Sequence, residues 1–229
     1  LFLYWLWRAL ERPRPRLRDA LPAGLALGVG LYTYFASRIM PVLLATFSLY
    51  LLLFRRAALR RLWRVLALTL AIGITLAVPL ALAIGRPADA RISELATPLR
   101  ALAAGNARPL LETTWGTLGM FHATGDPEWL YNIAGRPLFN LPGALLFALG
   151  VGIALRRWRQ PCAALLFLWL ALGLAPACVS IPAASLSHTI IAQPAVYLLS
   201  AGVTVEVARW AQRRTLGWGV DWLRHAARW

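Results

Sequence analysis

The sequence contains no lysine and few acidic residues. All 24 basic residues are arginine, against nine aspartates and glutamates, and the formal net charge is +15. Charged residues make up 14% of the chain, whereas a soluble domain usually has about 25%. The arginines stand in short clusters between apolar runs. This placement argues against nucleic-acid binding and is typical of the connections between membrane spans.

Cysteine is scarce, and motifs for cofactors and metals are missing. Cys162 and Cys178 are the two cysteines, and both lie in one apolar run. Helical geometry would separate them by ~24 Å, which excludes a disulfide because the Cα atoms must approach within about 7 Å. The chain has no glycine-rich phosphate loop, no metal-ligand spacing and no G-x-S-x-G elbow. We therefore expect no cofactor and identify no metal ligands, and a requirement for a metal stays open.

Long apolar runs are what the sequence does contain. It is 59% hydrophobic with a mean hydropathy of +0.61, and runs of about 17–20 apolar residues recur. We predict an all-α integral membrane protein with about six complete spans. The expected spans are Leu21–Ser37, Ile39–Phe54, Val65–Ile84, Leu138–Leu155, Pro161–Ile181 and Thr189–Val207. Residues 1–7 are typical of a truncated span, so we expect the C-terminal fragment of a longer protein.

The arginines predict an orientation. Connections at 8–20, 55–64 and 156–160 and the tail 208–229 hold 18 arginines, and the opposite side holds six. The arginine-dense side should face the cytoplasm. We therefore expect a multi-pass protein of the cell (inner) membrane, divided into 1–84, an extracytoplasmic loop at 85–137, 138–207 and a basic cytoplasmic tail.

The loop at 85–137 is the polar interval of the chain, with five of its nine carboxylates. Ile92, Leu95, Leu99 and Leu102 follow helical spacing that Pro98 interrupts or kinks, and Pro109–Phe121 suits a second helix with proline in its first turn. We expect both to be short interfacial helices.

Polar residues collect at the outer ends of the predicted spans. Tyr32, Tyr34 and Arg38 close the first complete span, and His188 precedes the sixth. Asp126, Tyr131, Asn132 and Arg136 lie at the same depth in the loop. Arginine among tyrosines at a bilayer surface suits a lipid phosphate, because guanidinium offers fixed charge and a planar fork of donors.

Simpler interpretations of these residues stay open. Arg38 could end a helix by snorkelling, and Arg136 could hold the loop through a carboxylate. The tyrosines could form an aromatic belt, and His188 could be an ordinary interfacial histidine. Asp126, between Gly125 and Pro127, could serve only to make a turn.

Three runs resemble GT-C membrane glycosyltransferases, of the protein O-mannosyltransferase and lipid A aminoarabinose transferase type. They are Gly28–Pro41 (GVGLYTYFASRIMP), the segment Leu118–Pro137, and His188–Tyr197 (HTIIAQPAVY). The resemblance covers roughly residues 20 to 205. It implies transfer of a sugar, with inversion, from a polyprenyl-phosphate donor to a protein, lipid or glycan acceptor on the extracytoplasmic face.

The resemblance also implies roles for residues. Tyr32, Tyr34, Arg38 and His188 would bind the donor lipid phosphate, and Asp126, Tyr131, Asn132 and Arg136 would order the loop over the substrates. A carboxylate N-terminal to Leu1 would be the general base, so this fragment should be inactive alone. Relatives often carry arginine where this chain has His188.

Two other functions remain open. A transporter or lipid flippase would need ionisable groups inside the bilayer, and no predicted span carries a charge in its middle. A non-catalytic membrane scaffold subunit is the third possibility.

Overall fold

The computed structural model describes residues 1–84 and 96–214, and within these ranges all regular secondary structure is helical. The elements are α1 (Phe2–Glu11), η1 (Leu17–Asp19), α2 (Ala20–Thr33), η2 (Phe35–Ile39), α3 (Met40–Phe54), α4 (Arg56–Ile84), α6 (Thr97–Ala103), α7 (Arg108–Gly119), α8 (Leu141–Arg156), α9 (Pro161–Cys178), α10 (Leu186–Thr189) and α11 (Gln193–Arg214). The tail beyond Arg214 and the predicted helical positions Ile92 and Leu95 lie outside the described residues.

An N-terminal group of helices, α1 to α4, surrounds one apolar core that includes Leu43, Phe47 and Leu62. Within it, α2 lies against α4 with little side-chain volume between them. A Cβ at Gly24 would stand 2.6 Å from the Ile72 Cβ, and one at Gly28 would meet Leu76 equally closely. These glycines therefore permit close helix packing, as the sequence predicted.

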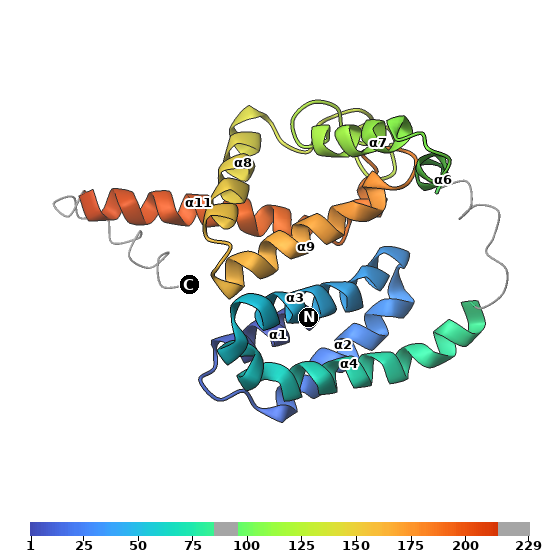
Figure 1. Cartoon of the computed structure of the whole chain (residues 1–229). Helices are drawn as coiled ribbons and strands as arrows, with labels where there is room; N and C mark the ends of the chain where they lie inside the picture. The colour runs from blue at the N-terminus through green and yellow to red at the C-terminus, as the bar shows by residue number, and fades with distance from the viewer. Residues whose placement is uncertain (85–95, 215–229) are drawn as a thin grey trace.

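A second apolar core lies among α8, α9 and α11, and α9 lies between the two groups of helices (Figure 1). Phe121 and Phe139 pack against Phe147 of α8, with ring centroids 4.5 and 5.9 Å away. Trp169 of α9 touches both cores and donates a hydrogen bond to the Ile191 carbonyl, 2.7 Å away. The chain thus has two helical groups that share α9.

Within the described ranges, three helical segments are long and apolar enough to cross a membrane, namely Phe35–Phe54, Arg56–Ala83 and Pro161–Cys178, and Leu141–Arg156 is a shorter apolar helix. The prediction of an all-α, multi-pass membrane protein agrees with this. Two other expected spans have different bounds in the described structure. Helix α2 stops at Thr33 after 14 residues, which is about 21 Å, and α11 begins at Gln193 rather than Thr189.

The arginine-dense connections are shorter than the sequence predicted. The expected connection at 55–64 is reduced to Arg55, because α4 begins at Arg56. Alanine, leucine and arginine are good helix formers, and arginine side chains reach outward along a helix, so the cluster does not interrupt it. Arg55 donates to the Arg159 carbonyl at 2.8 Å, and the Tyr50 hydroxyl to the Trp158 carbonyl at 2.9 Å. Two arginine-dense connections therefore meet at one end of the molecule.

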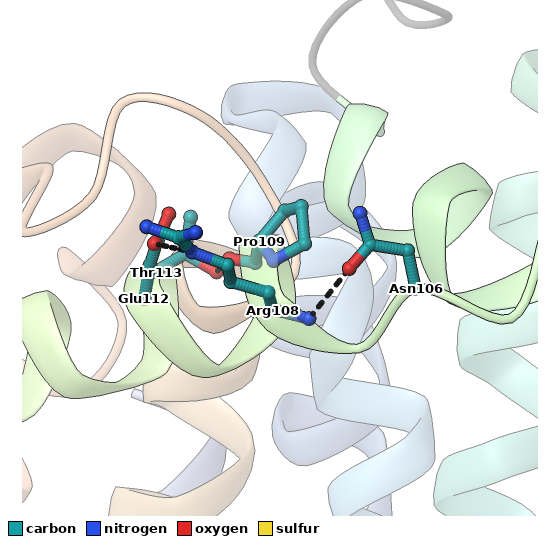
Figure 2. Close-up of polar contacts among 5 residues, drawn as sticks. All are labelled: Asn106, Arg108, Pro109, Glu112 and Thr113. Atoms are coloured by element: carbon teal, nitrogen blue, oxygen red, sulfur yellow. Dashed lines mark hydrogen bonds and ion pairs between the residues drawn. The ribbon is translucent and has the colours of Figure 1, made fainter.

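The helix predicted at Pro109–Phe121 is present as α7, with Pro109 in its first turn. Its N-terminus is shown in Figure 2. The Asn106 side chain accepts a hydrogen bond from the Arg108 backbone N–H, and the Arg108 guanidinium pairs with Glu112 at 2.7 Å. Thr113 faces α9, and its hydroxyl lies 2.6 Å from the Cys178 carbonyl. In α6, Pro98 stands in the first turn and does not interrupt the helix.

Candidate functional site

A cavity of about 350 Å³ lies where the α2–α3 junction approaches the C-terminal end of α9. Its lining comes from segments far apart in the sequence. The lining residues are Tyr34, Phe35, Ala36, Ala96, Leu99, Pro176, Val179, Ser180 and His188. Most of this wall is apolar, and its side-chain polar groups belong to Tyr34, Ser180 and His188. Such a space, with few polar groups in an apolar wall, is typical of a small-molecule site.

A break in the helical backbone places the first part of this lining. Tyr34 is extended (φ −154°, ψ 145°), which separates α2 from η2. Hydroxyl groups bond to carbonyls on both sides of the break, and the Tyr34 carbonyl also accepts the Ser37 N–H at 3.1 Å. Thr33 donates to the Gly30 carbonyl at 2.7 Å, and the buried Ser37 hydroxyl lies against the carbonyls of Gly30 and Tyr34. The run of hydroxyl residues therefore stabilises the turn that brings Phe35 and Ala36 to the cavity.

Arg38 stands beside the cavity without lining it. Its exposed guanidinium lies over the Phe35 ring, 4.8 Å from the ring centroid, and Phe35 is part of the cavity wall. No carboxylate within the described ranges pairs with Arg38. A cation–π contact of this kind holds the guanidinium at the rim of the cavity, and none of its N–H groups donates to another described residue.

His188 and Ser180 form the polar pair in the opposite wall. The Nδ1 of His188 lies 2.9 Å from the Ser180 hydroxyl, which also donates to the Pro176 carbonyl at 2.6 Å. Burial lowers the pKa of His188, and the nearby charges of Glu128 and Asp126 oppose that shift. The imidazole is therefore neutral at pH 7.

Tyr32 is apart from the other predicted phosphate ligands. Its hydroxyl donates to the Leu76 carbonyl of α4 at 2.7 Å, and it does not line the cavity. Tyr34 and His188 share the cavity, although they are 154 positions apart in the sequence. The structure thus brings together two of the four predicted phosphate ligands, holds Arg38 at the rim and places Tyr32 against α4.

The predicted loop residues form a separate closed turn. Asp126 is fully buried, and its carboxylate accepts from the backbone N–H groups of Glu128 at 2.8 Å and Leu186 at 2.6 Å. Asn132 donates to the Arg136 carbonyl at 2.6 Å, and the Gly135 N–H donates to the Asp126 carbonyl. Asp126 and Asn132 therefore shape the loop with their polar groups.

Tyr131 and Arg136 are exposed on this loop. The Arg136 side chain has no ion pair with another described residue, so the predicted carboxylate partner is not among them. The loop meets the cavity region through α10, because Leu186 bonds to Asp126 and lies two positions before His188. No cluster of metal-ligating side chains occurs in residues 1–84 and 96–214.

Ser180 and Phe35 are functional candidates that sequence reasoning missed. A serine just after an apolar helix has no distinctive pattern, although its spacing of four from Pro176 suits a bond to a helical carbonyl. In the sequence, Phe35 is one more apolar residue at the end of a predicted span. Both are recognised only once the cavity is seen.

No protein-family model, curated protein or solved structure matches this chain. Any function assigned to it rests on its own residues and their geometry.

Proposed function

We propose that this chain is the C-terminal membrane portion of an enzyme that transfers a sugar from a polyprenyl-phosphate donor to an acceptor on the extracytoplasmic face. In this proposal about six helices cross the bilayer, the segment 85–137 lies outside, and the tail is cytoplasmic. The resemblance in the three sequence runs and the geometry of the cavity support it.

The cavity that joins Tyr34 to Ser180 and His188, with Arg38 at its rim, is the observation that carries the proposal. A lipid phosphate needs fixed positive charge and hydrogen-bond donors next to an apolar wall. The Arg38 guanidinium and the Tyr34 hydroxyl supply the charge and a donor. Phe35, Leu99 and Val179 supply apolar surface for the first carbons of the chain.

The position of this cavity relative to the arginines supports the proposed orientation. Arg55 and Arg159 meet at the end of α3 and the start of α9. The cavity lies at the opposite ends of the same helices, next to Phe35 and Val179. The positive-inside rule assigns the arginine-dense end to the cytoplasm, so the cavity would open toward the outside.

In this proposal the described residues bind and position the substrates. The general base would lie in a segment before Leu1, as the resemblance implies. Asp126 cannot reach an acceptor hydroxyl, because it is buried and both of its oxygens accept backbone hydrogen bonds. Fixed positive charge at Arg38 would stabilise the phosphate as it leaves the sugar. Tyr131 and Arg136 would contact substrate from the exposed side of the loop.

Arg38→Ala tests the proposal. The chain in phosphatidylcholine nanodiscs should bind farnesyl phosphate, and Arg38→Ala should weaken binding by about tenfold to a hundredfold, the range for a charge-assisted hydrogen bond. Arg108→Ala is the matched control, because Arg108 pairs with Glu112 on an exposed surface. In the full-length enzyme, Arg38→Ala should abolish transfer without affecting membrane insertion. Equal binding and full transfer in Arg38→Ala would refute the assignment.

A further inference from the structure

The hydrogen bonds of Ser180 decide which ring nitrogen of His188 carries the proton. A serine hydroxyl has one hydrogen and two lone pairs. Ser180 gives its hydrogen to the Pro176 carbonyl, 2.6 Å away. The 2.9 Å contact between Ser180 and His188 Nδ1 must then be donated by the ring. Nδ1 therefore carries the hydrogen in the neutral imidazole.

The other ring nitrogen, Nε2, is left as a hydrogen-bond acceptor. His188 lines the cavity, and its Nε2 makes no hydrogen bond to any residue in the described parts of the chain. Among the described residues, the charged groups near the ring are Asp126 and Glu128 of the loop. The cavity neighbours from α6, α9 and the α2–α3 junction are uncharged, and Arg38 lies beyond Phe35. A neutral acceptor nitrogen attracts a donor hydrogen and offers nothing to a phosphate dianion.

We propose that His188 binds an alcohol hydroxyl of the substrate through Nε2, with the ring held by Ser180, and that it does not contact the phosphate. This inference rests on the proposed function and deepens it. The phosphate would lie on the Arg38 and Tyr34 side of the cavity, and a hydroxyl on the His188 side. The hydroxyl belongs either to the sugar of the donor or to the acceptor.

The tautomer can be measured directly by solid-state ¹⁵N NMR on histidine-labelled chain in nanodiscs. The sequence has three histidines, so the His188 signals are identified by their loss in His188→Gln. We expect a protonated Nδ1 and an unprotonated Nε2 at pH 8. In Ser180→Ala the ring should exchange between tautomers. A protonated Nε2 in the unaltered chain would overturn the inference.

Three probes then test the ligand class at pH 8, where a phosphate monoester is a dianion because its second pKa is about 6. Farnesol represents an acceptor alcohol, octyl glucoside a sugar, and farnesyl phosphate the anion. Farnesol or octyl glucoside should shift the Nε2 signal, and the one that does so identifies the source of the hydroxyl. If neither shifts Nε2, or if farnesyl phosphate protonates the ring, the inference is wrong. Failure of the proposed function is distinct, because farnesyl phosphate binding would then not depend on Arg38.

Conservative replacement separates this role from simple packing. The side-chain amide of glutamine can place an oxygen near the position of Nε2, so His188→Gln should bind the responding alcohol within about threefold of the unaltered chain. His188→Leu keeps apolar volume without an acceptor and should weaken binding by about tenfold. Equal loss in both variants would show that the ring only fills space and would overturn the inference.

Discussion

The Asp126 carboxylate accepts a hydrogen bond from the Leu186 backbone N–H at 2.6 Å, across 60 positions of sequence. Leu186 is the first residue of α10, so the carboxylate satisfies an N–H that has no helical partner. The same carboxylate binds the Glu128 N–H within its own turn. One buried side chain therefore joins the loop to the short helix that carries His188.

Replacing Asp126 should loosen this junction. In Asp126→Ala two backbone N–H groups of a part-buried junction lose their acceptor, and we expect the free energy of unfolding to fall by about 1–3 kcal/mol. The measurement is unfolding in mixed micelles followed by circular dichroism. Glu112→Gln is the control, because its ion pair with Arg108 is exposed and worth little. Similar small losses in both variants would contradict the structural role given to Asp126.

The close contact of α8 with α11 requires a glycine at position 150. A Cβ at Gly150 would overlap the Leu199 carbonyl, whereas one at Gly152, in the same helix, would meet open space. Gly150→Ala should therefore lower the free energy of unfolding by about 1–3 kcal/mol. Gly152→Ala should raise it by up to about 1 kcal/mol, since alanine favours helix. Equal stability of the two variants in a micelle unfolding titration would mean that α8 does not pack on α11 in this way.

His188 should make stability depend on pH. Burial lowers its pKa in the folded chain below the value of about 6.5 for free histidine. As pH falls, the unfolded chain is therefore protonated before the folded chain. The contribution of neutral His188 to the free energy of unfolding is complete above about pH 6.5 and is lost as pH falls toward the folded pKa. We expect His188→Gln to flatten this part of the pH profile of unfolding. A slope unchanged in His188→Gln would contradict the assignment.

The sequence predicted the class of fold because hydrophobic length is a one-dimensional property. Apolar runs gave an all-helical membrane protein, and glycine spacing indicated the close approach of α2 to α4. The end of α2 was less predictable, because Thr33 and Tyr34 are compatible with a continuing helix. The break there depends on hydroxyl groups that bond to the carbonyls of Gly30 and Tyr34.

The sequence indicated which residues lie near the ends of the helices, and it did not indicate how the chain turns there. Tyr34 and His188 were expected at the same depth, and they do line one cavity. Tyr32 was grouped with them, yet it lies in the last turn of α2, before the break at Tyr34, and its hydroxyl bonds to α4. Ser180 was missed because its role depends on Pro176 and His188 being nearby in space.

The orientation of the chain can be tested in intact cells. In a background with Cys162→Ala and Cys178→Ala, single cysteines are introduced as Tyr131→Cys in the exposed turn and Arg159→Cys in the arginine-dense connection. The positive-inside rule predicts that a membrane-impermeant maleimide labels Tyr131→Cys in intact cells and Arg159→Cys only after permeabilisation.

The opposite labelling pattern would place the cavity end of α9 in the cytoplasm. Transfer on the extracytoplasmic face would then be wrong, because Arg38, Tyr34 and His188 lie at the same end of the helices as the turn that carries Tyr131. Labelling of both positions in intact cells would instead mean that α8, the helix between them, does not carry the chain across the bilayer. Only the predicted pattern keeps the cavity on the side where a lipid-linked sugar would meet its acceptor.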